Sequence, residues 1–285
     1  MYNVIPEEYL VQHITLALEE DVRDGDHSSM ACISKNTTDK AKLVAKQEGI
    51  ICGIEIARKV YSLVDDKIIF TPFLKDGDKI KKGDIVFKVD GPAIGILTAE
   101  RTALNYMQRL SGIATATNEY VGIIKGTKTK LLDTRKTTPS MRLFEKYAVK
   151  VGGGYNHRIG LYDMIMLKDN HIDFAGGIKE AITKTKEYLK RIGKDLKIEI
   201  EVRSMEELEQ VMEIGGVDRI MLDNFTPELL TKAVDRIGKS YETESSGGIT
   251  KETILSYARS GVDYISVGSL THQIKSLDLS LVADR

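Results

Sequence analysis

One repeating pattern fills the second half of this 285-residue chain and constrains its fold more than any other feature. Short apolar runs end abruptly in polar or glycine residues, and most are followed by a helical stretch. The seven runs are residues 129–132, 148–151, 164–167, 198–200, 219–222, 241–244 and 264–267. From Leu167 onward, successive ends are separated by about the length of one strand, crossover and return in a parallel sheet. The pattern therefore predicts repeated βα units and a TIM-like α/β barrel.

The first half of the chain has a different texture and predicts a separate α+β domain. Its apolar spacing indicates a helix beginning near Pro6 and another over about 53–64. Four β-like runs are separated by turn signals, and they cover residues 41–45, 68–70, 84–89 and 93–97. A further helix is expected over 101–125, with the domain boundary near residues 111 and 112. The expected division is an N-terminal domain over 1–111, a barrel over 112–270, and a segment over 271–285 that returns to the N-terminal domain.

Composition excludes several classes of protein. Lysine plus arginine total 41 against 42 aspartate plus glutamate, so bulk charge argues against nucleic-acid binding. No apolar run approaches the roughly 18 residues that a bilayer span needs, and the first residues lack the pattern of a signal peptide. Two cysteines without a C-x-x-C spacing predict neither a disulfide framework nor a zinc site. We expect a protein of the reducing cytoplasm that uses neither a membrane nor a nucleic acid as partner.

The predicted strand ends carry residues that suit a charged ligand. Active sites of α/β barrels lie where the strands end, so residues from distant segments are expected to meet there. The ends hold cations (Arg135, Lys136, His157, Arg158, Lys168, His171), carboxylates (Asp133, Asp169, Glu201, Asp223) and small residues (152–154, 246–248, 268, 269). Clustered cations favour a polyanionic ligand, and glycine-rich ends before helices can present backbone N–H groups to phosphate. Glu201 and Asp223 can hold Mg²⁺ or bond sugar hydroxyls.

These strand ends also carry a long, ordered resemblance to a known family. The central motifs are DTRKTTP at 133–139, GGGYNHRIGL at 152–161 and KDNH at 168–171. Further matching segments lie at 100–105, 110–115, 201–202, 222–225, 246–249 and 267–272. Together they cover the chain from about residue 100 onward, and they resemble the quinolinate phosphoribosyltransferases. The sequence departs from the expected motifs at Ser140, where glycine is common, and at Arg203, where a smaller or acidic residue is expected.

The resemblance implies a fold, a reaction and a set of roles. The fold is an N-terminal α+β sandwich followed by an incomplete α/β barrel, and the reaction converts quinolinate and phosphoribosyl pyrophosphate to nicotinate mononucleotide, pyrophosphate and CO₂ with Mg²⁺. It also implies a homodimer, and leaves a higher oligomer open. The implied quinolinate-binding cations are Arg135, His157, Arg158 and Lys168, with Arg101 inserted by the partner subunit. Lys136 is implied to lie between the substrate carboxylate and the phosphates. Glu201 and Asp223 are implied to hold the ribose and magnesium, directly or through water. The implied 5′-phosphate site consists of Ser246, Gly247, Gly248, Gly268 and His272. Lys136, Lys168, Glu201 and Asp223 are the expected catalytic residues.

Three alternatives remain open at this stage. A relative of the same fold could act on another acid such as nicotinate, although the number of cations favours a diacid. A non-catalytic, molybdenum-transport-linked relative is disfavoured because both carboxylates and the full set of cations are present. The turn-rich segment 76–84 resembles a lipoyl or biotinyl carrier module, but no modifiable lysine lies at a hairpin tip between matching strands.

Overall fold

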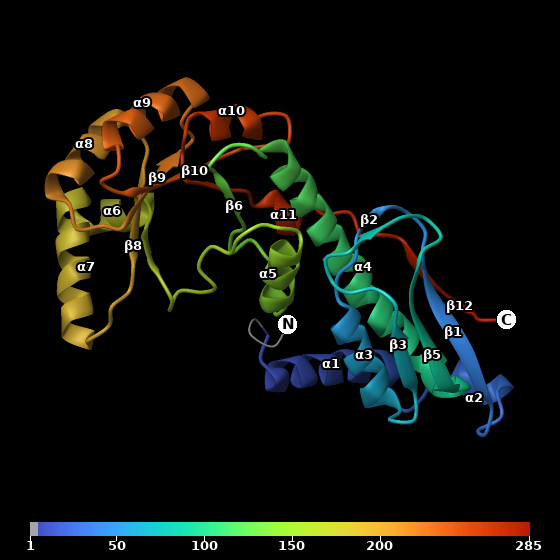
Figure 1. The fold of residues 1–285 in the computed structure, drawn as a ribbon. Helices are drawn as coiled ribbons and strands as arrows, with labels where there is room; N and C mark the ends of the chain where they lie inside the picture. Colours follow the sequence, from blue (N-terminus) through green and yellow to red (C-terminus); the bar gives the residue numbers. More distant parts are fainter. Residues whose placement is uncertain (1–4) are drawn as a thin grey trace. The chain divides into compact units, whose positions relative to one another are not determined.

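The computed structural model describes residues 5–285, which fold into two compact units (Figure 1). Of the described residues, the first unit comprises 5–118, 138–153 and 273–285, and the second comprises 119–137 and 154–272. Each unit is therefore built from segments that are distant in the sequence. None of the helices among residues 5–285 combines the length and the apolar character needed to cross a membrane.

The first unit contains a four-stranded antiparallel sheet in the order β12-β1-β5-β3. Its strands are β1 (Thr38–Ala45), β3 (Ile69–Pro72), β5 (Ile85–Pro92) and β12 (Leu279–Ala283), and a small second sheet pairs β2 (Gly49–Ile50) with β4 (Lys79–Ile80). Its helices are α1 (Glu7–Val22), α2 (His27–Cys32), α3 (Ile54–Val64) and α5 (Arg142–Val151), with most of α4 (Ala93–Ile123). The predicted strands over 41–45, 68–70 and 84–89 and the helix over 53–64 are confirmed.

Two predicted strands of this region are wrong, because both belong to helices. Residues 93–97 form the first turns of α4, which runs without a break from Ala93 to Ile123. Residues 148–151 are the last turn of α5, whose buried side chains Phe144, Ala148 and Val149 recur at helical spacing. Gly152 ends that helix against α4, where a Cβ would lie 2.4 Å from the Ala114 carbonyl oxygen. The glycines after α5 therefore permit close helix packing and do not end a strand.

The second unit contains a six-stranded parallel sheet in the order β6-β11-β10-β9-β8-β7. Its strands are β6 (Lys130–Leu132), β7 (Ile165–Leu167), β8 (Ile198–Val202), β9 (Arg219–Asp223), β10 (Glu242–Ser246) and β11 (Tyr264–Ser266). The crossovers carry α6 (Asp169–Ala175), α7 (Ile178–Ile192), α8 (Met205–Ile214), α9 (Pro227–Ile237) and α10 (Ile254–Arg259), followed by α11 (Ser269–His272). β6 and β7 lie at opposite ends of the strand order, which confirms the predicted incomplete barrel.

Local sequence explains why the chain leaves each central strand at a defined point. The side chain of Ser204 accepts a hydrogen bond at the start of α8, and Thr226 does the same for α9, where Pro227 occupies the first turn. Each cap follows its strand within a few residues, so helix formation begins directly after the strand ends. Because β8 and β9 are parallel and in register, their final residues lie next to each other at one edge of the sheet.

Candidate active site

Charged residues lie on three neighbouring strands of the parallel sheet, β8, β9 and β10. On β8, Glu199 and Glu201 point to the face opposite that of Ile200. The strand register places Glu199 beside Arg219 on β9, which in turn lies beside Glu242 on β10. Charged side chains therefore lie side by side near the starts of these strands, and Glu201 and Asp223 add carboxylates near the ends of β8 and β9.

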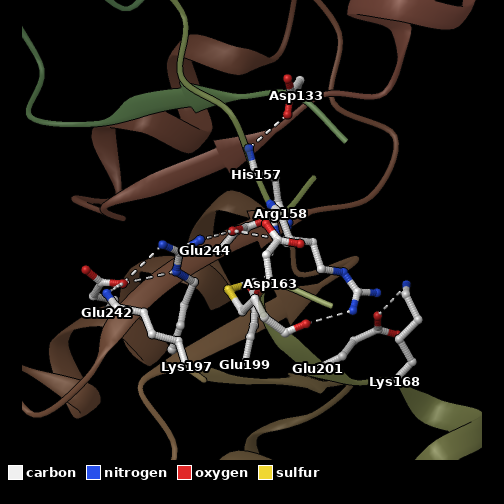
Figure 2. A network of polar contacts seen from close by, with 12 residues as sticks. Asp133, His157, Arg158, Asp163, Lys168, Lys197, Glu199, Glu201, Glu242 and Glu244 are labelled. Atoms are coloured by element: carbon white, nitrogen blue, oxygen red, sulfur yellow. Dashed lines mark hydrogen bonds and ion pairs between the residues drawn. The ribbon is translucent and has the colours of Figure 1, made fainter. Parts of the chain in front are cut away.

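Lys168, Glu201 and Asp223 form a group at the carboxyl ends of the strands, which we call the strand-end cluster. Lys168 follows β7, and its Nζ lies 3.2 Å from Oε2 of Glu201 (Figure 2). Burial raises the pKa of the Glu201 carboxyl, Lys168 opposes this effect, and the charges of Asp223 and Asp169 raise the pKa further. Burial likewise raises the pKa of Asp223, against the opposing charges of Lys168 and Lys136. Distant strand ends thus bring the predicted catalytic carboxylates and lysines into electrostatic contact.

Two arginines in the segment between β6 and β7 interact electrostatically. Burial, and then the charge of Arg135, lower the pKa of the Arg158 guanidinium. The Nη1 atom of Arg158 donates a hydrogen bond to the Met164 carbonyl oxygen at 3.2 Å. A guanidinium whose charge is disfavoured by burial and by a neighbouring cation is better accommodated when an anion lies beside it. Arg135 and Arg158 therefore place positive charge in the segment between β6 and β7.

A third group assembles around the glycine that follows β11. A Cβ at Gly268 would lie 3.0 Å from Cδ of Lys136 and 3.2 Å from Nε2 of His272, so the three residues are neighbours. The Thr271 hydroxyl donates a hydrogen bond of 2.6 Å to the Lys136 carbonyl oxygen and fixes this arrangement. The predicted phosphate-end residues Lys136, Gly268 and His272 are thus brought together.

The loop after β10 also requires glycine. Gly247 has a φ of 105°, and a Cβ there would lie 2.2 Å from Oδ1 of Asn224. Gly248 has a φ of 58°, and no atom within 4 Å would meet a Cβ at that position. Ser246 ends β10 opposite Asp223 in the register. The predicted segment 246–248 is therefore a tight turn beside the end of β9 where backbone N–H groups lie close to the strand-end cluster.

Arg101 is the one predicted site residue that belongs to the first compact unit. It lies on α4 with an exposed side chain. The two residues that depart from the family motifs have simple local explanations. Ser140 has a φ of 64°, a conformation that favours glycine. The exposed Arg203 precedes α8, and its Nη2 lies 2.6 Å from Oε1 of Glu207 in the first turn of that helix.

Sequence reasoning named His157 but missed its polar neighbours on the sheet, the buried Glu199 and Glu244 and the partly buried Arg219; we call these four residues the core cluster. Nε2 of His157 lies 2.9 Å from Oε2 of Glu199 and 3.6 Å from Oε2 of Glu244 (Figure 2). Nη1 of Arg219 lies 2.9 Å from the same Glu244 oxygen. Burial, and then the charge of Glu199, raise the pKa of Glu244 to about 7. Two sequence segments could have indicated this cluster. Glutamates alternate with apolar residues in IEIEV at 198–202, and two glutamates stand two positions apart in ETESS at 242–246.

The structure distinguishes two places where a metal ion could bind. His157, Glu199 and Glu244 have ligand atoms within 4.8 Å of one another, but Arg219 already supplies positive charge beside Glu244. Glu201 and Asp223 offer oxygen ligands at the open ends of the strands, where the negative charge of Asp223 contributes to raising the pKa of Glu201. A divalent cation would relieve that repulsion, and Mg²⁺ prefers oxygen ligands. The donor chemistry at Glu201 and Asp223 therefore fits Mg²⁺.

A parallel α/β sheet whose strand ends combine paired guanidiniums, lysines and carboxylates defines an enzyme class that binds acidic, phosphorylated substrates. Family models for the N-terminal and C-terminal domains of quinolinate phosphoribosyl transferase match residues 26–111 and 113–282. The chain belongs to the quinolinate phosphoribosyltransferase family.

Individual relatives agree over nearly the whole chain. The chain is 43% identical to a probable nicotinate-nucleotide pyrophosphorylase (carboxylating) of Bacillus subtilis, over 95% of this chain and 91% of the relative. It is 42% identical to quinolinate phosphoribosyltransferase (decarboxylating) 1b of Nicotiana tabacum, over 95% of this chain and 81% of that protein. The structure of the nicotinate-nucleotide pyrophosphorylase of Francisella tularensis superposes with a TM-score of 0.92 at 40% identity and covers 98% of both chains.

Proposed function

We propose that the chain transfers a phosphoribosyl group from phosphoribosyl pyrophosphate to quinolinate with decarboxylation. The products are nicotinate mononucleotide, pyrophosphate and CO₂, a step of de novo NAD synthesis. The names of relatives more than 40% identical support this reaction. The single structural observation that carries it is the 3.2 Å contact between Nζ of Lys168 and Oε2 of Glu201, which places a cation suited to an acidic substrate beside a carboxylate suited to the ribose.

The cations hold the acid substrate in this proposal. Arg135 and Arg158 bind the carboxylates of quinolinate, and Lys168 adds a point charge from the end of β7. Because these groups are fixed by the fold, they orient the pyridine nitrogen toward the sugar before reaction. His157 is the fourth cation that the family resemblance assigns to quinolinate.

The carboxylates and the glycine-rich ends handle the sugar phosphate. As pyrophosphate leaves, the ribose C1 gains positive charge, which the carboxylates of Glu201 and Asp223 stabilise while they bind the ribose hydroxyls. Lys136, Gly268 and His272, with residues 246–248, bind the phosphate groups. Once the pyridine nitrogen has formed its bond to C1, the ring becomes cationic. It accepts the electron pair released when the adjacent carboxylate leaves as CO₂, and the ring carbon then takes up a proton.

Mg²⁺ is the expected metal ion. Glu201 and Asp223 are the residues that would hold it, directly or through water. When bound, Mg²⁺ supplies positive charge for the departing pyrophosphate.

The proposal includes a homodimer in the cytoplasm, with Arg101 completing the neighbouring active site. Arg101→Ala and Glu201→Ala variants, each inactive alone, are expected to recover activity after mixing, because an exchanged dimer pairs an intact Arg101 with an intact Glu201. Subunit exchange is followed independently by fluorescence transfer between labelled subunits. Exchange without recovery of activity would contradict the shared site.

A direct assay tests the reaction itself. Purified protein is incubated with Mg²⁺, phosphoribosyl pyrophosphate and either quinolinate or nicotinate, and CO₂ and nicotinate mononucleotide are followed together. Equal amounts of both products are expected from quinolinate. Product formation from nicotinate but not from quinolinate would contradict the assignment of a diacid substrate. If folded protein forms no product from either acid, the result would favour a non-catalytic relative.

A further inference from the structure

The two ring nitrogens of His157 have different partners inside the protein. Nδ1 accepts a hydrogen bond of 2.7 Å from the backbone N–H of Arg158. A nitrogen that accepts a hydrogen bond carries a lone pair, so the proton of the neutral ring lies on Nε2. A doubly protonated ring would direct an N–H against the N–H of Arg158. The backbone therefore selects the neutral Nε2–H tautomer.

The protonated nitrogen faces two buried carboxylates. Oε2 of Glu199 lies 2.9 Å away and Oε2 of Glu244 lies 3.6 Å away, and both glutamates are completely buried. They come from β8 and β10, and Arg219 on the intervening strand holds Glu244 at 2.9 Å. Because three neighbouring strands fix these groups, the acceptor side of His157 is part of the rigid sheet.

The segment that contains His157 and Arg158 is fixed at two successive backbone N–H groups. The N–H of His157 donates to Oδ1 of the buried Asp133 at 2.8 Å, and the N–H of Arg158 donates to the His157 ring. Figure 2 shows His157 between Asp133 above and Glu199 and Glu244 below, with Arg158 beside it. The direction in which the Arg158 side chain leaves the backbone thus depends on the position of the His157 ring.

We infer that Glu199 and Glu244 are positioning residues that, through a neutral His157, direct Arg158 toward the acidic substrate. This inference rests on the proposed function for the identity of that substrate. It gives His157 a different role from the one implied by the family resemblance, because a ring engaged on both nitrogens inside the fold supplies orientation and no positive charge. Only 8% of His157 is exposed, which agrees with a role inside the protein.

The tautomer can be measured without turnover. The chain has five histidines, so imidazole ¹H–¹⁵N correlation spectra are simple enough to assign, with a His157→Asn variant identifying the His157 signals. At pH 7 we expect one protonated nitrogen, Nε2, and one unprotonated nitrogen, Nδ1. A doubly protonated ring, or a proton on Nδ1, would overturn the inference.

Substitutions of the glutamates test the effect on substrate binding. Glu199→Gln and Glu244→Gln preserve shape and remove charge, and each is expected to raise the KM for quinolinate roughly tenfold or more, because misplacement of a binding group by about 1 Å is costly. The KM for phosphoribosyl pyrophosphate should change less than about twofold. Glu242→Gln is the matched control, since Glu242 also pairs with Arg219 but has no contact with His157. Equal changes in both KM values, or no change, would overturn the inference.

Two substitutions of His157 test the same inference if the glutamate variants fail to fold. In His157→Asn the amide oxygen can replace Nδ1 as acceptor for the Arg158 N–H, whereas in His157→Gln the amide reaches the position of Nε2. We expect the asparagine variant to have the lower KM for quinolinate. A higher KM for the asparagine variant, or equal values for the two, would contradict positioning through the Arg158 backbone. A protein inactive with quinolinate but showing the Nε2–H tautomer would refute the proposed function and leave the His157 geometry intact.

Discussion

The core cluster and the strand-end cluster lie on the same face of neighbouring strands and use the same kinds of side chain, yet they are balanced differently. On β8, Glu199 and Glu201 are separated by two residues, or roughly 7 Å. Glu199 faces a histidine, and Arg219 pairs with the neighbouring Glu244. Glu201 faces Lys168, whose side chain is 47% exposed.

This difference shows how one strand can contribute both to the stability of the fold and to ligand binding. Inside the sheet, charged groups are costly unless they are paired, and the members of the core cluster lie against one another, away from solvent. At the open end, pairing is incomplete and cations remain accessible, so the strand-end cluster can accept a charged ligand. A step of two residues along one strand therefore separates groups that support the fold from groups that act on substrate.

The largest expected effect is on activity, at the strand-end cluster. Glu201→Gln removes negative charge from the position where the ribose gains positive charge, so kcat should fall roughly 10²–10³-fold. The thermal midpoint should change little, because burial disfavours the ionised carboxylate in the resting protein. Steady-state kinetics and thermal unfolding of the same preparation measure both. A large loss of stability with normal turnover would reverse the distinction between the clusters.

The next effect is on stability, at the core cluster. Arg219→Met removes the arginine beside Glu244 and leaves a buried carboxylate without its nearest basic partner. We expect the free energy of unfolding to fall by about 3–5 kcal/mol and the thermal midpoint by roughly 10 °C. Denaturant and thermal unfolding check this. An unchanged midpoint would show that the core cluster does not depend on Arg219.

A smaller effect depends on pH and comes from Glu244. Its pKa is about 7 in the folded protein against an ordinary value of 4.5, so its contribution is fully present below about pH 4.5 and is lost as the pH rises through 7. Glu244→Gln removes this loss, and the stability of the variant relative to the unmodified protein should rise by up to about 3 kcal/mol between pH 5 and pH 8. Unfolding free energies across this range provide the measurement. Parallel curves would contradict the prediction.

The smallest effect is expected at the outer edge of the core cluster. Lys197 contacts Glu242 at 3.6 Å, and its side chain is 61% exposed. Lys197→Met should therefore change the free energy of unfolding by less than about 1 kcal/mol. It is also the matched control for Arg219→Met, because both substitutions remove a cation from the Glu242 carboxylate. A loss as large as that of Arg219→Met would show that charge count, and not burial, governs the cluster.

The sequence predicted the parallel sheet and the strand-end residues because both depend on local signals. Six of the seven apolar runs are strands, and Glu201 and Asp223 stand where β8 and β9 end. The run at 148–151 is wrong because a short apolar run cannot distinguish a strand from the buried side of a helix. The same ambiguity explains residues 93–97, which begin α4.

The core cluster escaped prediction for a different reason. Glu199 and Glu244 lie inside strands, where sequence reasoning expects apolar side chains, and their partners come from other strands. Arg219 is recognised as a core residue only when the register between β8, β9 and β10 is known. Pairing across strands is a property of tertiary structure, and no local pattern specifies it.

The pairing of β12 with β1 has a consequence during synthesis. β12 occupies residues 279–283 and aligns with Ala41–Ala45 of β1, and Asp284 then pairs with Lys42 and Lys88 at 2.8 and 2.5 Å. At roughly 5–20 residues per second, the ribosome delivers β12 on the order of ten seconds or more after β1. Throughout that interval the outer edge of β1 lacks its neighbour and could template aggregation. Asp39, Lys40 and Lys42 place charge along that strand, a composition that discourages unwanted pairing until the last strand arrives.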